Sequence, residues 1–236
     1  MKLAIMQPYF FPYLGYFSLI KHTDKFILLD DVQFIRHGWI ERNRVLKQND
    51  DWLYIKVPLI KSGRDTLIKD CHINNNQNWD RKLIAQLITY KKFAPYYKEV
   101  INLLINLFDR KFENITELNK ESLLLVCNYL NIEANIEIFS EMKMRIEEPK
   151  EADEWALNIC KEINNVDEYW NPIGGIDFFD KTKYQDAKIK LLFHKMNLEP
   201  YNQKRSEFFP ALSIIDVMMF NSVEETHKML DNYELV

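Results

Sequence analysis

The 236-residue sequence lacks the features that mark several large classes of protein. Its three cysteines, Cys71, Cys127 and Cys160, contain no CxxC pair, which argues against a disulfide framework and a zinc cluster, so we predict no metal site. No apolar run approaches the ~20 residues of a membrane span. The four apolar residues after Lys2 end at Gln7, which is too short a run for a signal peptide. We therefore expect a soluble, cytoplasmic protein with no membrane span.

The sequence has no excess of positive charge: it contains 31 Lys and Arg residues and 35 Asp and Glu residues, so the formal net charge is -4. Proteins that bind nucleic acid nonspecifically usually carry a basic surface, so no stable nucleic-acid complex is expected. The hydrophobic content of 47% is enough for a sizeable core, and the length suits a single domain over residues 1–236.

Short apolar runs alternate with helical patterns along the chain. The runs are expected to form strands near residues 3–6, 25–29, 52–58, 67–73, 136–139, 168–170 and 190–194. Apolar residues at helical spacing predict a helical block at about residues 79–131. Such alternation is typical of an α/β fold, so we predict a Rossmann-like fold with a mainly parallel sheet and this helical block as an insertion.

The first two predicted strands end at polar residues. Gln7 follows the first strand, and Asp30 and Asp31 follow the second. The ligand crevice of a parallel sheet lies beyond the carboxyl ends of its strands, so these side chains are expected to face it together. Asp30 or Asp31 is then a candidate catalytic base, and the alternative is that either one caps a turn.

The segment from Gln33 to Lys47 concentrates positive charge in an acidic protein. Arginine forks suit bidentate contacts with phosphate, so Arg42 and Arg44 are predicted to contact a diphosphate, although a solvated basic turn would have the same composition. Trp39 is expected to stack on a base or sugar, or else to join the core. His37 is an alternative catalytic base. Gln33 and Asn43 are further candidates for substrate binding.

Two of the five glycines form the pair Gly174-Gly175 after an aromatic strand. Backbone amides at such a pair are able to cradle an anion, which makes both glycines candidates for substrate binding. An ordinary tight turn is an equal alternative.

Four separated stretches resemble the WbqC-like family of bacterial polysaccharide-locus proteins. They are IMQPYFFPYLGYF (5–17), LDDVQFIRHGWIERNR (29–44), YWNPIGG (169–175) with the nearby DFFDK, and FFPALSIIDVMMFNS (208–222). The chain departs from the family pattern at Glu41, where that pattern has asparagine. The resemblance implies a role in O-antigen or capsule biosynthesis, in which an acyl or glycyl group is attached to an amino sugar.

A weaker likeness is to nucleotidylyltransferases such as pantothenate synthetase, which have an HxGH turn before their first helix. The frame Tyr13-Leu14-Gly15-Tyr16 is similar, with tyrosine in place of both histidines. This likeness implies a nucleotidylyltransferase-like (HUP) version of the Rossmann fold in which adenylation is lost, since tyrosine donates hydrogen bonds but carries no positive charge.

The resulting hypothesis is an N-acyl or aminoacyl (glycyl) transferase that forms an amide on a nucleotide-linked amino sugar. Gln7, Tyr13 and Tyr16 are expected to bind the substrate or its oxyanion. The acyl or aminoacyl donor stays open between acyl-CoA, aminoacyl-tRNA and an adenylate, and the sequence defines no cofactor. The alternatives are a noncatalytic nucleotide-sugar-binding or scaffold protein, and an ATP-dependent nucleotidylyltransferase or amide ligase.

Overall fold

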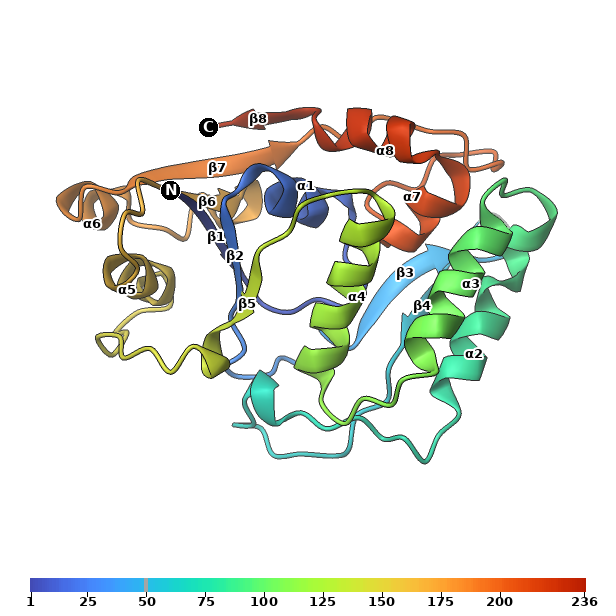
Figure 1. Ribbon diagram of the computed structural model, residues 1–236, viewed down its shortest axis with the longest axis horizontal. Helices are drawn as coiled ribbons and strands as arrows, with labels where there is room; N and C mark the ends of the chain where they lie inside the picture. Colours follow the sequence, from blue (N-terminus) through green and yellow to red (C-terminus); the bar gives the residue numbers. More distant parts are fainter. Residues whose placement is uncertain (49–50) are drawn as a thin grey trace.

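The chain is built around a six-stranded sheet, as seen in a computed structural model that describes residues 1–48 and 51–236 (Figure 1). The strands are β1 (Lys2–Met6), β2 (Lys25–Leu28), β5 (Ile136–Ile138), β6 (Glu168–Pro172), β7 (Lys190–Met196) and β8 (Tyr233–Leu235). Their order is β5-β2-β1-β6-β7-β8, with all neighbours parallel except β8, which runs antiparallel to β7. The predicted α/β, Rossmann-like fold with a mainly parallel sheet is confirmed.

The strand order reverses direction between β1 and β6. From β1 the chain builds outward through β2 to β5, and it then returns to the other side of β1 with β6 and β7. In open α/β sheets, ligands bind beyond the carboxyl ends of the strands at such a switch point. For this chain that position lies just past Met6 and Pro172, the last residues of β1 and β6.

Helices cover both faces of the sheet because successive strand residues point to opposite sides. Ala4 of β1 packs in the larger core cluster, with residues of α1 (Leu14–His22) and α4 (Ile115–Tyr129). Leu3 and Ile5 pack on the other face, in a smaller cluster with α5 (Glu154–Glu162) and α6 (Lys181–Asp186). The chain then ends in α7 (Ile214–Phe220), α8 (Val223–Leu230) and β8, and α8 packs against α1.

The long connection from β2 to β5 contains the inserted helical block. It consists of α2 (Trp79–Gln86), which continues as the 3-10 helix η2 (Leu87–Lys92), then α3 (Tyr97–Phe108) and α4. Figure 1 shows these helices beside an antiparallel hairpin of β3 (Arg42–Leu46) and β4 (Trp52–Lys56).

The hairpin corrects two strand predictions. The run at residues 52–58 was expected in the main sheet, but it forms β4 and pairs with β3 in a separate two-stranded sheet. The run at residues 67–73 contains the 3-10 turn η1 (Ile68–Asp70) instead of a strand. Both runs belong to the insertion, so they never reach the main sheet.

Buried polar side chains hold the aromatic turn between β1 and α1 in place. Asn43 Nδ2 donates to the carbonyl oxygens of Phe10 (3.1 Å) and Phe11 (2.9 Å). Ser213 Oγ also donates to Phe11 O at 2.8 Å, and Asn119 Nδ2 donates to Pro8 O at 2.8 Å. These bonds satisfy carbonyl groups that no strand or helix reaches, and they attach the turn to the insertion and to the C-terminal segment.

Candidate functional site

A cavity of about 320 Å³ lies at the switch point of the sheet. We call it the switch-point cavity. Its lining residues are Met6, Tyr9, Pro12, Tyr13, Trp39, Asn43, Arg44, Pro172 and Ala211. Met6 ends β1 and Pro172 ends β6, so the cavity lies where a doubly wound sheet is expected to bind a ligand.

Two tyrosines provide polar groups in this mainly apolar lining. Burial raises the pKa of Tyr9 and of Tyr13, so both phenols are protonated at neutral pH and act as hydrogen-bond donors. Within residues 1–48 and 51–236, neither hydroxyl has a hydrogen-bond partner. Both are therefore available to a ligand.

Gly15 gives Tyr13 its position. The Tyr13 ring lies against the first turn of α1, and a Cβ added at Gly15 would be 2.5 Å from the Tyr13 hydroxyl oxygen. Tyr13 is also the N-cap residue of α1, and its side chain makes no capping hydrogen bond. The positive end of α1 therefore lies beside the cavity without a side-chain cap, which favours an anionic ligand group there.

Arg44 supplies the positive charge of the cavity. Its guanidinium contacts two indole rings, 5.5 Å from the Trp39 centroid and 5.3 Å from the Trp52 centroid. One terminal nitrogen donates to Ala211 O at 3.1 Å, and Nε is buried with no partner among the described residues. Aromatic faces stabilise the cation and hold its fork in one place, which suits phosphate recognition.

The two arginines that were predicted to contact a diphosphate, Arg42 and Arg44, do not line the same cavity. Arg42 lies two residues from Arg44 on β3, but it is not a lining residue of the switch-point cavity. Its guanidinium lies 4.0 Å from the centroid of the Tyr54 ring, and it donates to the carbonyl oxygens of His37 and Gly38. Arg44 is the arginine of the cavity, and Arg42 closes the preceding loop.

Asn43 lines the cavity but has no free polar atom there. Its Nδ2 group is bonded to the aromatic turn, and its Oδ1 accepts the amide of Arg44 at 2.8 Å. Asn43 therefore positions the cavity walls, and a direct contact with substrate would require breaking these bonds.

Tyr16 and Gln7 support the cavity from behind. The Tyr16 side chain is buried in the core, and its hydroxyl donates to Gln7 O at 2.8 Å. Gln7 directly follows β1, as predicted, but neither residue is among those that line the cavity. In the HxGH-like frame, only Tyr13 faces the site.

The acidic pair lies at a different place from the one predicted. Asp30 follows β2 closely, but its carboxylate accepts hydrogen bonds from the Ser140 amide (3.0 Å) and hydroxyl (2.7 Å). Burial raises the pKa of Asp30. Asp31 forms an ion pair with Lys69 at 2.5 Å. Asp30 lines a separate cavity of about 210 Å³ beyond β2 and β5, and neither carboxylate lines the switch-point cavity.

The loop before β3 is likewise outside the switch-point cavity, apart from Trp39. Gln33 Nε2 donates to Arg64 O at 2.9 Å, and Arg36 donates to Ser62 O. His37 is exposed and has φ of 63°, in the left-handed region. Arg36 and His37 line another cavity, which is described below.

Gly174 and Gly175 form the tight turn rather than an anion cradle. They belong to the 3-10 helix η4 (Ile173–Gly175), and neither has a positive φ, so the alternating conformation of an anion-binding nest is missing. A Cβ at Gly175 would lie 2.2 Å from Asn171 Nδ2, so the Asn171 side chain packs directly against this glycine.

Other groups that resemble nucleophiles are buried. Ser18 donates its hydroxyl to Leu230 O at 2.7 Å, so its oxygen accepts a hydrogen bond from His194 Nε2 at 2.9 Å, and both side chains are in the core. The pKa of the Cys71 thiol is raised to about 11 and that of Cys127 to about 12, mainly by burial. None of these groups is in reach of a substrate.

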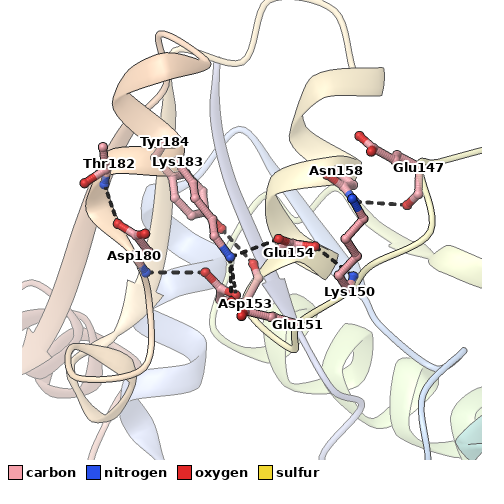
Figure 2. A network of polar contacts seen from close by, with 10 residues as sticks. All are labelled: Glu147, Lys150, Glu151, Asp153, Glu154, Asn158, Asp180, Thr182, Lys183 and Tyr184. Atoms are coloured by element: carbon pink, nitrogen blue, oxygen red, sulfur yellow. Dashed lines mark hydrogen bonds and ion pairs between the residues drawn. The ribbon is translucent and has the colours of Figure 1, made fainter.

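A polar network joins α5 to α6 on the far side of the sheet (Figure 2). Lys183 Nζ contacts carboxylates of Glu151 (2.8 Å), Asp153 (3.2 Å) and Glu154 (2.9 Å). These carboxylates raise the pKa of Lys183. Because Lys183 of α6 is bound to Glu154 of α5 and to two carboxylates just before α5, we interpret the network as a tie between the two helices and not as a ligand site.

Two features are absent from the part of the chain that the structure describes. No group of His, Cys, Asp and Glu side chains there is arranged to hold a metal ion. No helix there is both long enough and apolar enough to cross a membrane.

Five lining residues of the switch-point cavity were not predicted from the sequence: Met6, Tyr9, Pro12, Pro172 and Ala211. A signal for them was present, because all nine lining residues fall within the four stretches that carry the family resemblance. Those stretches are far apart in sequence and meet at this cavity.

The fold and the cavity define a Rossmann-like α/β protein with a cavity at the switch point of its sheet. The chain belongs to the WbqC-like protein family, whose model matches residues 7–228. It is also 27% identical over 223 residues to a protein of Mycobacterium tuberculosis named "Uncharacterized protein Rv1507c", and the match covers 93% of each chain. No solved structure matches the chain significantly.

Proposed function

We propose that the protein binds a nucleotide-linked amino sugar in the switch-point cavity and forms an amide on its amino group, in O-antigen or capsule biosynthesis. One observation supports this most strongly: every residue that lines the cavity belongs to a stretch that resembles the family. The cavity also combines aromatic walls with one guanidinium, which is the chemistry that a base or sugar ring and a diphosphate require.

Each polar group then has a role. Arg44 and the positive end of α1 bind the diphosphate, and Trp39 stacks on the base or the sugar. The Tyr9 and Tyr13 hydroxyls, kept protonated by burial, donate hydrogen bonds to the sugar or to the oxyanion that forms during transfer.

The reaction needs little acid–base help from the protein. The neutral amine attacks the carbonyl carbon of an acyl or aminoacyl donor, a C–N bond forms, and the bond to the leaving group breaks. The proton lost from nitrogen leaves with that group. The lining contains no carboxylate or imidazole, so the amine must enter the cavity uncharged.

The same absence of a base in the lining favours one alternative, a protein that binds the nucleotide sugar without catalysis. An ATP-dependent nucleotidylyltransferase is less favoured, because the buried Tyr16 hydroxyl is bonded to Gln7 O and is not directed at a phosphate.

Mass spectrometry tests the proposal. The protein is incubated with UDP- and dTDP-linked amino sugars and, in separate reactions, with an acyl-CoA, an aminoacyl-tRNA, or an amino acid with ATP. We expect an amide product with one donor class. Binding of the amino sugar without product from any donor would support the noncatalytic alternative, and no binding at all would contradict the assignment of the cavity.

A further inference from the structure

A second cavity, of about 220 Å³, lies between the loop before β3 and the segment after β4. It is distinct from the switch-point cavity and shares none of its lining residues. The charged side chains in its lining are Arg36, Glu41, Lys56 and Lys61, beside apolar Phe34 and Leu59. We call it the Glu41 cavity.

Glu41 is a buried carboxylate with an unused oxygen. The residue is 3% exposed, and its Oε1 accepts the His37 amide at 2.9 Å. Its Oε2 is buried and has no hydrogen-bond partner among residues 1–48 and 51–236. A buried carboxylate oxygen without a partner is costly, because its hydration is lost and nothing replaces it. A ligand with a donor group would remove that cost.

The loop holds this carboxylate in one orientation. His37 adopts a left-handed conformation, which few non-glycine residues take, and this brings its amide to Glu41. Arg42 then closes the loop by donating to His37 O and Gly38 O. Backbone strain of this kind is common at ligand sites.

Positive charge surrounds Glu41 without neutralising it. Lys56 and Lys61 are exposed, and the side chain of neither has an ion pair or hydrogen bond with another described residue. Arg36 is occupied by Ser62 O. A small cavity therefore keeps one buried negative group and two free ammonium groups apart, and the complementary ligand carries charges of both signs.

We propose that the Glu41 cavity binds a small zwitterion, with its primary ammonium group on the Glu41 carboxylate and its carboxylate or phosphate on Lys56 and Lys61. The volume supports a small ligand, because pockets for drug-sized molecules start at roughly 300 Å³. An α-amino acid and an amino-alkyl phosphate share this chemistry. The site does not depend on amide transfer in the switch-point cavity.

Isothermal titration of the full chain tests this site with glycine, L-alanine, L-serine and phosphoethanolamine. We expect saturable binding of at least one probe. Binding of the amino acids would identify an α-amino acid as the ligand class, and binding of phosphoethanolamine would identify an amino-alkyl phosphate. N-acetylglycine, which has no ammonium group, is expected not to bind. Equal binding of glycine and N-acetylglycine would reveal an anion site and contradict the role of Glu41. No saturable binding of any probe would overturn the proposal.

Variants assign the binding to this cavity. Glu41→Gln keeps the volume and removes the charge, so affinity is expected to fall roughly tenfold or more, as for a lost charge-assisted hydrogen bond. If that variant does not fold, the double variant Lys56→Gln/Lys61→Gln carries the test, since both lysines are exposed. Arg44→Met, in the other cavity, is the matched control and should leave the affinity unchanged. A loss seen only with Arg44→Met would refute the site.

Discussion

The buried pair of His194 and Ser18 makes the stability of the protein depend on pH in a way that one substitution isolates. Burial, assisted by the positive charge of His22, lowers the pKa of His194 from its usual 6.5 to about 4. As the pH falls, this histidine is therefore protonated near pH 6.5 in the unfolded chain but only near pH 4 in the folded chain. Stability from this group is fully present above pH 6.5 and is lost as the pH falls toward 4.

The magnitude follows from the pKa shift. At pH 5 this histidine is almost fully protonated in the unfolded chain and about one-tenth protonated in the folded chain. One pKa unit corresponds to about 1.36 kcal/mol, so the histidine lowers the free energy of unfolding by about 2 kcal/mol between pH 8 and pH 5. Asp216 acts in the opposite direction. Burial raises its pKa to about 6, so the folded state gains stability as the pH falls through 6. The two effects partly cancel in the wild type.

His194→Gln separates them, because glutamine keeps a donor for Ser18 and does not titrate. Urea unfolding followed by tryptophan fluorescence, at pH 8 and pH 5, measures the free energy of unfolding of both proteins. We expect the wild type to lose about 2 kcal/mol more than His194→Gln over this range. The exposed His72→Gln variant is the control and should match the wild type. Equal pH dependence of the wild type and His194→Gln would refute the assigned pKa.

Three further substitutions test how the site is held together. Gly15→Ala is expected to weaken binding of a nucleotide-linked amino sugar by about tenfold, because the new Cβ displaces the Tyr13 ring. The melting temperature should not fall, because alanine favours the helix by about 1 kcal/mol. Unchanged affinity in calorimetry would show that Tyr13 does not contact the ligand. Asn43→Ala should lower the free energy of unfolding by about 3 kcal/mol in urea, since it leaves buried backbone groups without partners, and a loss below about 1 kcal/mol would contradict that role. Asp30→Asn should leave the affinity for the nucleotide-linked amino sugar unchanged in calorimetry, because Asp30 is bonded to Ser140 outside the cavity. A tenfold loss of affinity would show that Asp30 belongs to the binding site.

The sheet could be predicted from sequence because its strands are short apolar runs that stop at polar residues, as at Met6-Gln7. The hairpin was harder. In β3, Asn43 points to the buried side while Arg42 and Arg44 are only half-buried, so the alternation of polar and apolar residues that marks a strand is broken. The buried Asn43 is explained by its bonds to the aromatic turn, which no local pattern reveals.

The candidate site was predicted in part for the same reason. Tyr13, Trp39 and Arg44 do meet in one cavity. The position of Asp30 outside this cavity could not be predicted, because its partner, Ser140, is 110 residues away. In sequence, a carboxylate that follows a strand looks the same whether it binds a ligand or a neighbouring loop. Tyr16 is one helical turn from Tyr13 and yet faces the core.

The most direct test of the switch-point cavity is a calorimetric titration of UDP- and dTDP-linked amino sugars into the wild type, Arg44→Met and Arg42→Met. The two arginines lie on the same strand, and both contact aromatic rings, but only Arg44 lines the cavity. We predict saturable binding to the wild type, a loss of roughly tenfold or more for Arg44→Met, and little change for Arg42→Met. Absence of binding to the wild type, or equal losses in the two variants, would contradict the site.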